Sequence, residues 1–460
     1  MNTWESIISY KRYGYESSET NSFRSEFIRD YDKILFMSAF RRLQNKTQVF
    51  PLPGNVFLHN RLTHSIEVAS VGRSLGNIVG AKILENNIDR LDESAKNFYK
   101  YELSGVISSA CLAHDIGNPA FGHSGEKAIS NYFITQADNN INGKALKDNF
   151  NTEEWLDLTN FEGNANALRI LTKQYRGRLP GGQRLMYITL ASILKYTCNS
   201  SEIDKSIVSQ KKYGYFQSEK EIYLSIVNEC KMNSIHDRQV RHPFVYLVEA
   251  ADDICYRIID LEDGHRIGIL TFEEISKAFL TLYEQLLSDD PQKIIETNSV
   301  LSKIGDRNEA VSYLRAKCIS GLIHTASNTF VAHADEILAG KFNNTLIDLV
   351  ETKAPYLREI EKISVDRIYN HHSVIQVELA GYNVMSALLE TFVTAVIKDT
   401  KSPIEKKIVQ LIPDQFNYTY TDTSAYEKTM GVLDFVSGMT DGYATEIYRK
   451  IKGIDIASHR

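Results

Sequence analysis

The sequence predicts a mostly helical protein with little β structure. Its 460 residues include only nine prolines, and long runs of helix-forming residues outnumber segments that alternate between polar and apolar positions. An apolar content of 43% is sufficient to bury a large core. Because no internal repeat, low-complexity tract or linker rich in Gly or Ser divides the chain, we expect residues 1–460 to form a single large helical body.

Helical spacing of apolar residues predicts the elements in order. One expected helix starts near His64, where apolar residues recur at i, i+3, i+7, i+10 and i+11, so that His64 falls in its first turn. The other elements expected before residue 262 are a helix over 23–44, an extended piece over 47–51 with a turn at Pro53 and Gly54, a polar connection or exposed helix end over 85–98, a loop over 136–155, a helix opening near Asn160 and a buried helix over 243–261. The later helices are expected over 271–287, 308–340, 343–362, 374–397 and 425–451.

Charge and cysteine content argue against several classes of protein. A net charge of −6 and a pI near 6.1 give no global reason to expect nucleic-acid binding. The five cysteines are scattered and form no C-x-x-C pair, which disfavours a disulfide framework and a thiolate zinc site. No signal peptide and no unbroken apolar stretch long enough to span a bilayer is found. We therefore expect a cytoplasmic protein with no membrane partner.

Residues 114–126 concentrate the residue types that perform chemistry. His114 and Asp115, both metal-ligand types, end an apolar run and are followed at once by a helix-breaking Gly-Asn-Pro. Beyond the break, His123 and Glu126 stand three residues apart at the expected start of a new helix, close enough to face one another. The pattern predicts a helix that delivers two ligands at its end.

Further metal ligands must come from elsewhere in the chain. His64 is a candidate because it starts a rigid helix, and Asp252 because an acidic pair with Asp253 inside an apolar helix costs on the order of 3 kcal/mol or more if buried unpaired. Mixed imidazole and carboxylate donors suit Mn, Fe, Zn or Mg and do not select among them. Taken singly, each residue also has a structural alternative: a histidine bonded to backbone, a helix cap, or an ion pair with Arg257 or Arg241.

Taken together, these residues resemble the HD-domain phosphohydrolases, and within them the bacterial deoxyguanosinetriphosphate triphosphohydrolases. The order of His64, then His114 and Asp115, then Asp252 carries the resemblance, and it extends over most of the chain. The matching segments are Arg-Arg-Leu-Gln-Asn-Lys-Thr-Gln-Val-Phe-Pro-Leu (41–52), Arg-Leu-Thr-His-Ser (61–65), His-Asp-Ile-Gly-Asn-Pro-Ala-Phe-Gly-His (114–123), Phe-Glu-Gly-Asn-Ala-Asn-Ala-Leu-Arg (161–169), Leu-Lys-Tyr (194–196), Glu-Ala-Ala-Asp-Asp-Ile-Cys-Tyr (249–256), Leu-Ala-Gly-Tyr (379–382) and Ser-Gly-Met-Thr-Asp (437–441).

The resemblance implies a fold and a set of roles. It places an HD metal-binding core at about 55–265 and further helices at about 270–460. The implied ligands of one divalent metal per subunit (Mg²⁺, Mn²⁺ or Fe²⁺) are His64, His114, Asp115 and Asp252. His123 and Glu126 would form a catalytic pair in which Glu126 orients His123 for proton transfer. The implied substrate contacts are Arg61, Lys195, Lys212 and Asn164 (or Asn166) toward the phosphates and nucleotide, Tyr256 and Asp260 toward the sugar and its 3′-hydroxyl, and Gln48 against the deoxyribose.

The implied reaction is attack of water on the α-phosphorus of dGTP, which gives deoxyguanosine and intact triphosphate. Broader hydrolysis of dNTPs and a non-catalytic protein that senses nucleotide or nucleic acid are the alternatives. For residues 195–216 a solvated loop is the alternative to phosphate and base contacts. The resemblance further implies a homo-oligomer, either a hexamer or another multimer of dimers, and leaves single-stranded DNA open as an effector.

Overall fold

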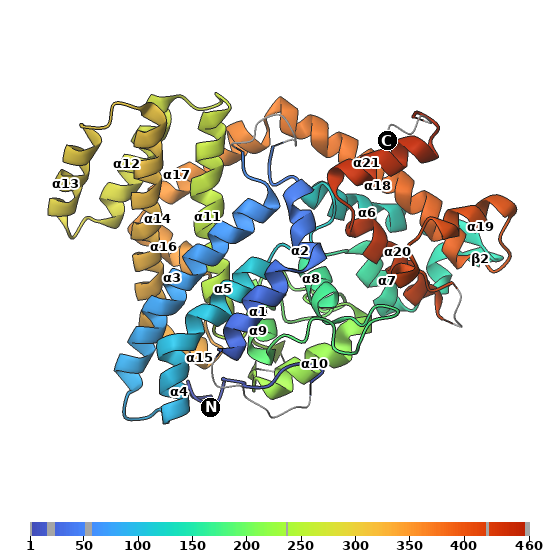
Figure 1. Ribbon diagram of the computed structural model, residues 1–460, viewed down its shortest axis with the longest axis horizontal. Helices are drawn as coiled ribbons and strands as arrows, with labels where there is room; N and C mark the ends of the chain where they lie inside the picture. Colours follow the sequence, from blue (N-terminus) through green and yellow to red (C-terminus); the bar gives the residue numbers. More distant parts are fainter. Residues whose placement is uncertain (1, 16–23, 51–57, 236–237, 420–422, 456–460) are drawn as a thin grey trace.

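The structure is a computed structural model that describes residues 2–15, 24–50, 58–235, 238–419 and 423–455. Within these ranges the chain is built from helices joined by short connections, with two small antiparallel two-stranded sheets (Figure 1). The mostly helical class is therefore confirmed. The predicted turn at Pro53 and Gly54 lies outside the described residues.

The helices of the first half of the chain surround three long or buried elements, α3, α5 and α11. The α-helices are α1 (Glu26–Leu35), α2 (Ser38–Arg42), α3 (Arg61–Asn87), α4 (Glu93–Asn97), α5 (Leu103–Ala113), α6 (Gly122–Thr135), α7 (Thr152–Thr159), α8 (Gly163–Thr172), α9 (Tyr187–Ile193), α10 (Lys220–Glu229) and α11 (Val245–Arg266). Short 3₁₀ and π turns are η1 (Leu43–Asn45), η2 (Phe98–Glu102), η3 (Leu146–Asn149), η4 (Val208–Gln210) and η5 (Gln217–Glu219).

The second half of the chain adds helices at both ends of the molecule (Figure 1). These are α12 (Phe272–Leu286), α13 (Pro291–Leu301), α14 (Arg307–Ala332), α15 (Ala334–Leu338), α16 (Leu346–Lys353), α17 (Tyr356–Ile363), α18 (His372–Ile397), α19 (Pro403–Gln410), α20 (Ala425–Ser437) and α21 (Asp441–Ile451), with η6 (Ser364–Tyr369) and η7 (Asp414–Phe416). The strands are β1 (Asn140–Ile141) with β2 (Lys144–Ala145), and β3 (Ser234–Ile235) with β4 (Arg238–Gln239).

Side-chain caps fix several helix starts. Asn60 begins α3 with a reciprocal capping box, in which its side chain accepts from the backbone of Leu62 and Thr63 while the Thr63 hydroxyl accepts from the Asn60 backbone. Such a cap stabilises a helix start by about 1 kcal/mol. Because the cap lies only four residues before His64, it also fixes where His64 projects.

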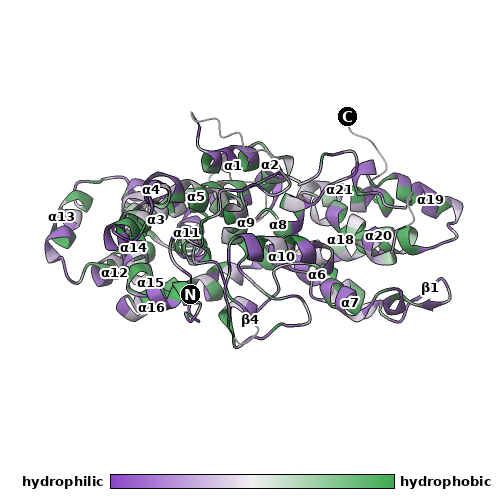
Figure 2. Cartoon of the chain, turned by 90° about the horizontal axis from the view of Figure 1, so that it is seen from below, coloured by the Kyte–Doolittle hydropathy of each residue, from purple (hydrophilic) through white to green (hydrophobic). Residues whose placement is uncertain are grey.

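Two hydrophobic clusters of buried residues hold the helices together. The first takes residues from α3, α5, α11, α12 and α14, and the second from α6, α18 and α20. They occupy the left and right parts of Figure 1 respectively. Figure 2 shows that most helices carry a hydrophilic and a hydrophobic side, as amphipathic helices packed around a core do.

Several predicted element boundaries differ from those in the structure. The helix expected over 23–44 is broken at Phe36 and Met37, and the one over 343–362 is broken where Pro355 starts a new helix. The loop expected over 136–155 contains the β1–β2 hairpin and the start of α7. Over 85–98, where a connection or an exposed helix end was expected, α3 ends at Asn87 and the short helix α4 follows. Two unpredicted helices, α13 and α19, begin with proline at the first helical position, where its missing N–H costs nothing.

Among the described residues one helix, α18, is long and apolar enough to cross a membrane by length and composition. In its most apolar window 56% of the residues are buried inside the protein.

Candidate active site

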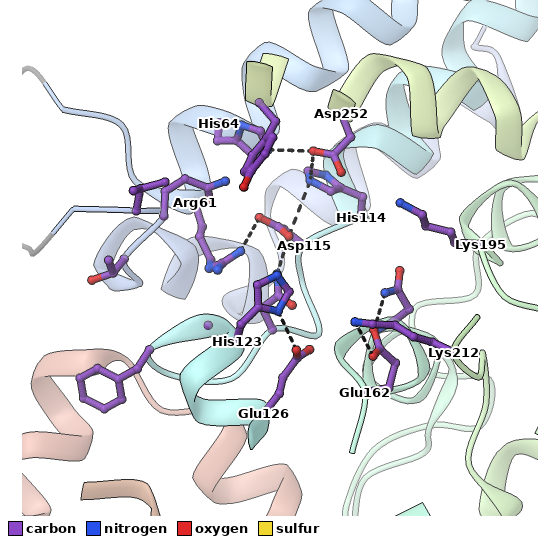
Figure 3. Close-up of a pocket in the computed structure, with 18 of the residues that line it drawn as sticks. Arg61, His64, His114, Asp115, His123, Glu126, Glu162, Lys195, Lys212 and Asp252 are labelled. Carbon is purple, nitrogen blue, oxygen red and sulfur yellow. Dashed lines mark hydrogen bonds and ion pairs between the residues drawn. The ribbon is translucent and has the colours of Figure 1, made fainter. Parts of the chain in front are cut away.

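A cavity of about 530 Å³ opens between the elements of the two cores. Figure 3 shows His64, His114 and Asp252 gathered on one side of it and His123 with Glu126 on the other. All but one of the residues predicted for the site line this cavity. They are Gln48, Arg61, His64, His114, Asp115, His123, Glu126, Asn164, Lys195, Lys212, Asp252 and Tyr256.

Three helices of the first core position a cluster of potential metal ligands. His64 lies in the first turn of α3, His114 caps the end of α5, and Asp252 lies in the middle of α11. Their donor atoms all lie within 4.8 Å of one another. Asp252 Oδ1 is 3.1 Å from His64 Nε2 and 3.4 Å from His114 Nε2.

The chemistry of this cluster fits a divalent metal. His114 donates its Nδ1–H to the Cys111 carbonyl at 2.6 Å, which leaves Nε2 as the nitrogen with the lone pair. That Nε2 is buried and has no hydrogen-bond partner. Burial opposes a positive charge on His114, but the Asp115 and Asp252 carboxylates outweigh burial and raise the pKa of the imidazole to about 9. The same negative potential favours a bound cation.

Asp115 borders the cluster without belonging to it. Its Oδ1 is 3.6 Å from His114 Nε2, whereas its Oδ2 accepts a hydrogen bond from Arg61 Nη1 at 2.8 Å. Asn118 donates to the same carboxylate. Burial raises the pKa of Asp115, but Arg61 and the two neighbouring histidines outweigh it and hold that pKa below its ordinary value. Its role as a fourth ligand stays a prediction.

His123 and Glu126 form the pair that the sequence predicted. His123 Nδ1 lies 2.8 Å from Glu126 Oε2, and Glu126 Oε1 accepts the Gly163 backbone N–H at 2.8 Å. Burial disfavours the Glu126 carboxylate, yet its bond to His123 and the nearby Lys212 hold the pKa of Glu126 below its ordinary value. The His123 ring is 75% exposed and lines the cavity, so its Nε2 is free to exchange a proton with a bound molecule.

The two lysines reach the cavity with glutamate partners that the sequence analysis missed. Lys212 Nζ lies 2.7 Å from Glu162 Oε2, and Lys195 Nζ lies 3.4 Å from Glu249 Oε1. Burial lowers the pKa of each lysine, but the carboxylates outweigh it and raise both pKa values, so both side chains are charged. Asn164 donates from Nδ2 to Glu162 Oε1 at 2.7 Å and is thereby held beside Lys212.

The predicted sugar contacts are only partly presented to the cavity. Gln48 lines it, and its Oε1 is buried without a hydrogen-bond partner, which leaves an acceptor for a ligand. Tyr256 lines it and stacks on Tyr369 with a centroid separation of 5.5 Å. Asp260 is the exception, because it is not among the described residues that line the cavity and its Oδ2 accepts from the Tyr369 hydroxyl at 2.6 Å. A direct sugar contact from Asp260 stays a prediction.

Other residues of the lining were not predicted, among them Glu162, Glu249, Tyr369 and Glu378. Glu162 caps α8 and Glu249 lies in the second turn of α11, each as a partner of a lysine. Tyr369 ends a π-helical turn, and Glu378 lies on α18. Only Glu162 had a sequence signal, since an acidic side chain two residues before Asn164 suits a helix cap.

Comparisons with known proteins agree with this geometry. The helical fold, with the His114–Asp115 doublet meeting His64 and Asp252 in one cavity, defines an HD-domain phosphohydrolase. The HD domain family matches residues 61–178, and a phosphohydrolase-associated domain matches residues 350–450.

Relatives that match almost the whole chain define its family more narrowly than the domain matches do. The chain is 36% identical to a deoxyguanosinetriphosphate triphosphohydrolase-like protein of Synechocystis sp. over 463 residues, covering 98% of this chain and 100% of that protein. It is 36% identical to a protein of the same description from Pseudomonas aeruginosa (98% of each chain) and 29% identical to the deoxyguanosinetriphosphate triphosphohydrolase of Yersinia enterocolitica (96% and 97%). The chain belongs to the deoxyguanosinetriphosphate triphosphohydrolase-like family of HD-domain proteins.

Proposed function

We propose that this protein hydrolyses deoxynucleoside triphosphates, with dGTP as the preferred substrate, to the deoxynucleoside and intact triphosphate. The observation that carries the proposal is the meeting, in one cavity, of the His64–His114–Asp252 cluster and the His123–Glu126 pair. Relatives named for deoxyguanosinetriphosphate triphosphohydrolysis support the substrate class.

Different side chains of the cavity would have different roles in such a reaction. Arg61, Lys195 and Lys212 bring positive charge toward the phosphates of a bound nucleotide. A divalent metal held by the His64–His114–Asp252 cluster would act as a Lewis acid at the reacting phosphate and lower the pKa of water. His123, oriented by Glu126, exchanges a proton with the attacking water or with the leaving 5′-oxygen.

A guanine preference has support from a carboxylate in the cavity lining. Glu378 on α18 is the residue that supplies it. Guanine presents neighbouring N1–H and N2–H donors, which a carboxylate can accept together. Broad dNTP hydrolysis is the alternative within the same chemistry. A non-catalytic sensor is disfavoured, because it would not need a proton-transfer pair in the cavity.

A panel of nucleotides tests the proposal. The purified protein is incubated with each of the four dNTPs, with deoxyinosine triphosphate and with GTP, in Mg²⁺ or Mn²⁺, and products are separated by chromatography. We expect deoxyguanosine and triphosphate as products, slower turnover of deoxyinosine triphosphate, which lacks the N2 amine, and little turnover of GTP. Release of pyrophosphate or of single phosphate would contradict the mechanism, and equal rates for all four dNTPs would establish the broad alternative.

The proposal also includes expectations about metal content, oligomeric state and location in the cell. We expect one divalent metal per subunit, a homo-oligomer, and a cytoplasmic location. Elemental analysis and native mass spectrometry of the purified protein measure the first two. Adding single-stranded DNA to the dGTP assay tests whether it acts as an effector.

A further inference from the structure

One carboxylate of the C-terminal region connects two segments of the cavity wall. Asp441, the first residue of α21, is buried, and its two oxygens accept hydrogen bonds from two backbone amides. Asp441 Oδ2 accepts from Thr47 N–H at 2.8 Å, and Asp441 Oδ1 accepts from Phe121 N–H at 2.9 Å. Hydrogen bonds from an amide to a charged carboxylate are among the stronger ones in proteins.

Both amides adjoin residues of the proposed active site. Thr47 directly precedes Gln48, and Phe121 lies two residues before His123 at the N-terminal end of α6. Lys46 reinforces the same connection, because its buried amino group donates to the Asn118 carbonyl at 2.5 Å and to the Ser437 carbonyl at 2.9 Å. The segment 437–441 therefore bonds directly to Thr47 and Phe121 and, through Lys46, is linked to Asn118 in the Gly-Asn-Pro turn.

The backbone at Phe121 needs such support. Phe121 is in the left-handed conformation (φ 60°, ψ 18°), which is unfavourable for a bulky residue and persists only when the surroundings impose it. The cap of α6 has no side-chain hydrogen bond of its own. On its other side the Phe121 ring lies so close to α18 that a Cβ at Gly381 would be 2.4 Å from Phe121 Cγ. Asp441 and α18 thus both contact Phe121 at the start of α6.

We infer that Asp441 is a positioning residue that sets the His123–Glu126 pair against the potential metal ligands. The inference rests on the proposed function for its kinetic consequence. His64, His114 and Asp252 are carried by α3, α5 and α11, whereas the pair is carried by α6, whose first residues bond to Asp441. A displacement of about 1 Å in such a group can lower a rate by up to about 100-fold.

Asp441→Asn tests this with little change in size. An amide has one acceptor oxygen, so one of the two backbone amides loses its partner. We expect kcat to fall about tenfold with bound metal unchanged, and amide hydrogen exchange to accelerate in peptides covering 118–130. Asp348→Ala, which removes an exposed acidic residue from the first turn of α16, is the matched control and should change neither. Unaltered kcat and exchange in Asp441→Asn would overturn the inference.

A double variant separates positioning from general destabilisation. If Asp441 acts through His123, adding Asp441→Asn to His123→Ala should lower kcat by no more than about twofold further, because groups acting as a unit are not additive. A full further tenfold loss would show that Asp441 acts elsewhere.

Two further measurements test the inference if the wild type is inactive or if Asp441→Asn does not fold. If the wild type hydrolyses no nucleotide, the proposed function fails, yet hydrogen exchange at 118–130 still decides whether Asp441 holds α6. If Asp441→Asn does not yield folded protein, Gly381→Ala displaces Phe121 from the other side and should give the same faster exchange and lower kcat; unchanged values would contradict the inference.

Discussion

The two walls of the cavity are held in different ways. On one wall, His64, His114 and Asp252 are fixed on helices of the first core, with the His64 side chain only 2% exposed. On the other wall, His123 is 75% exposed, and its position depends on the contact of its ring with the Glu126 carboxylate and, at the start of α6, on the hydrogen bond that the Phe121 N–H donates to Asp441. The first wall is fixed by packing and the second by individual polar contacts.

This difference predicts that changes on the two walls will affect metal binding and turnover differently. A change on the packed wall removes one of the potential ligands, so bound metal should be lost. A change on the polar wall leaves the potential ligands in place, so the metal should remain while turnover falls. Metal content and turnover measured together on the same variants can therefore confirm or refute the division.

Asp252→Ala should have the largest effect. The Asp252 carboxylate lies near both histidines, with its Oδ1 3.1 Å from His64 Nε2 and 3.4 Å from His114 Nε2. Burial raises the pKa of Asp252, but the charges of His114 and His64 and the hydrogen bond with His64 outweigh burial and hold that pKa well below its ordinary value. We expect loss of bound metal by elemental analysis and a decrease in dGTP turnover of about 10³-fold or more. Asp335→Ala on the exposed surface of α15 is the control. Undiminished metal content would remove Asp252 from the ligand set.

His123→Ala should come next, with a different signature. Loss of a general acid or base typically lowers kcat by about 10² to 10⁴-fold. Because His123 is outside the cluster of potential ligands, metal content should stay at the wild-type level. His324→Ala, an exposed histidine on α14, serves as the matched control for loss of an imidazole. Full turnover with metal bound would show that the acid/base assignment is wrong.

The packed wall was also the more predictable one from sequence. His64 and Asp252 stand on amphipathic helices whose spacing is visible in the chain, and His114 and Asp115 end a continuous apolar run. The His123–Glu126 contact was predictable for a similar reason, since three residues on a helix is a local distance. Local periodicity is sufficient for contacts within one element or for residues at element ends.

Contacts between distant elements could not be predicted in this way. Asp260 lies eight residues after Asp252 on α11, and eight residues of helix leave a rotation of about 80° and an advance of about 12 Å. Asp260 consequently lies beneath Tyr369, which is 109 residues away in sequence. The glutamate partners of Lys195 and Lys212 and the bonds of Asp441 are of the same kind, because each depends on how separate helices pack.

Asp260 gives the smallest predicted effect. This effect is on the free energy of unfolding and not on turnover. Burial raises the pKa of its carboxyl from 3.8 to about 8, and the hydrogen bond from Tyr369 only partly offsets this. Between about pH 4 and pH 8 the folded protein therefore holds a proton on Asp260 that the unfolded chain has released. By linkage, a state that binds more protons is favoured at low pH, so this group's contribution to stability is present below pH 4 and declines as pH rises toward 8.

Asp260→Asn cancels that dependence while keeping an oxygen that can accept from Tyr369. We expect the free energy of unfolding of the wild type to fall relative to Asp260→Asn as the pH rises from 5 to 8, by on the order of 4 kcal/mol. Urea denaturation of both proteins at several pH values, in the presence of a chelator, measures the difference, because all other titrating groups are shared. Parallel stability curves would mean that Asp260 is ionised in the folded protein, and its carboxylate would then be available to a 3′-hydroxyl after movement of Tyr369.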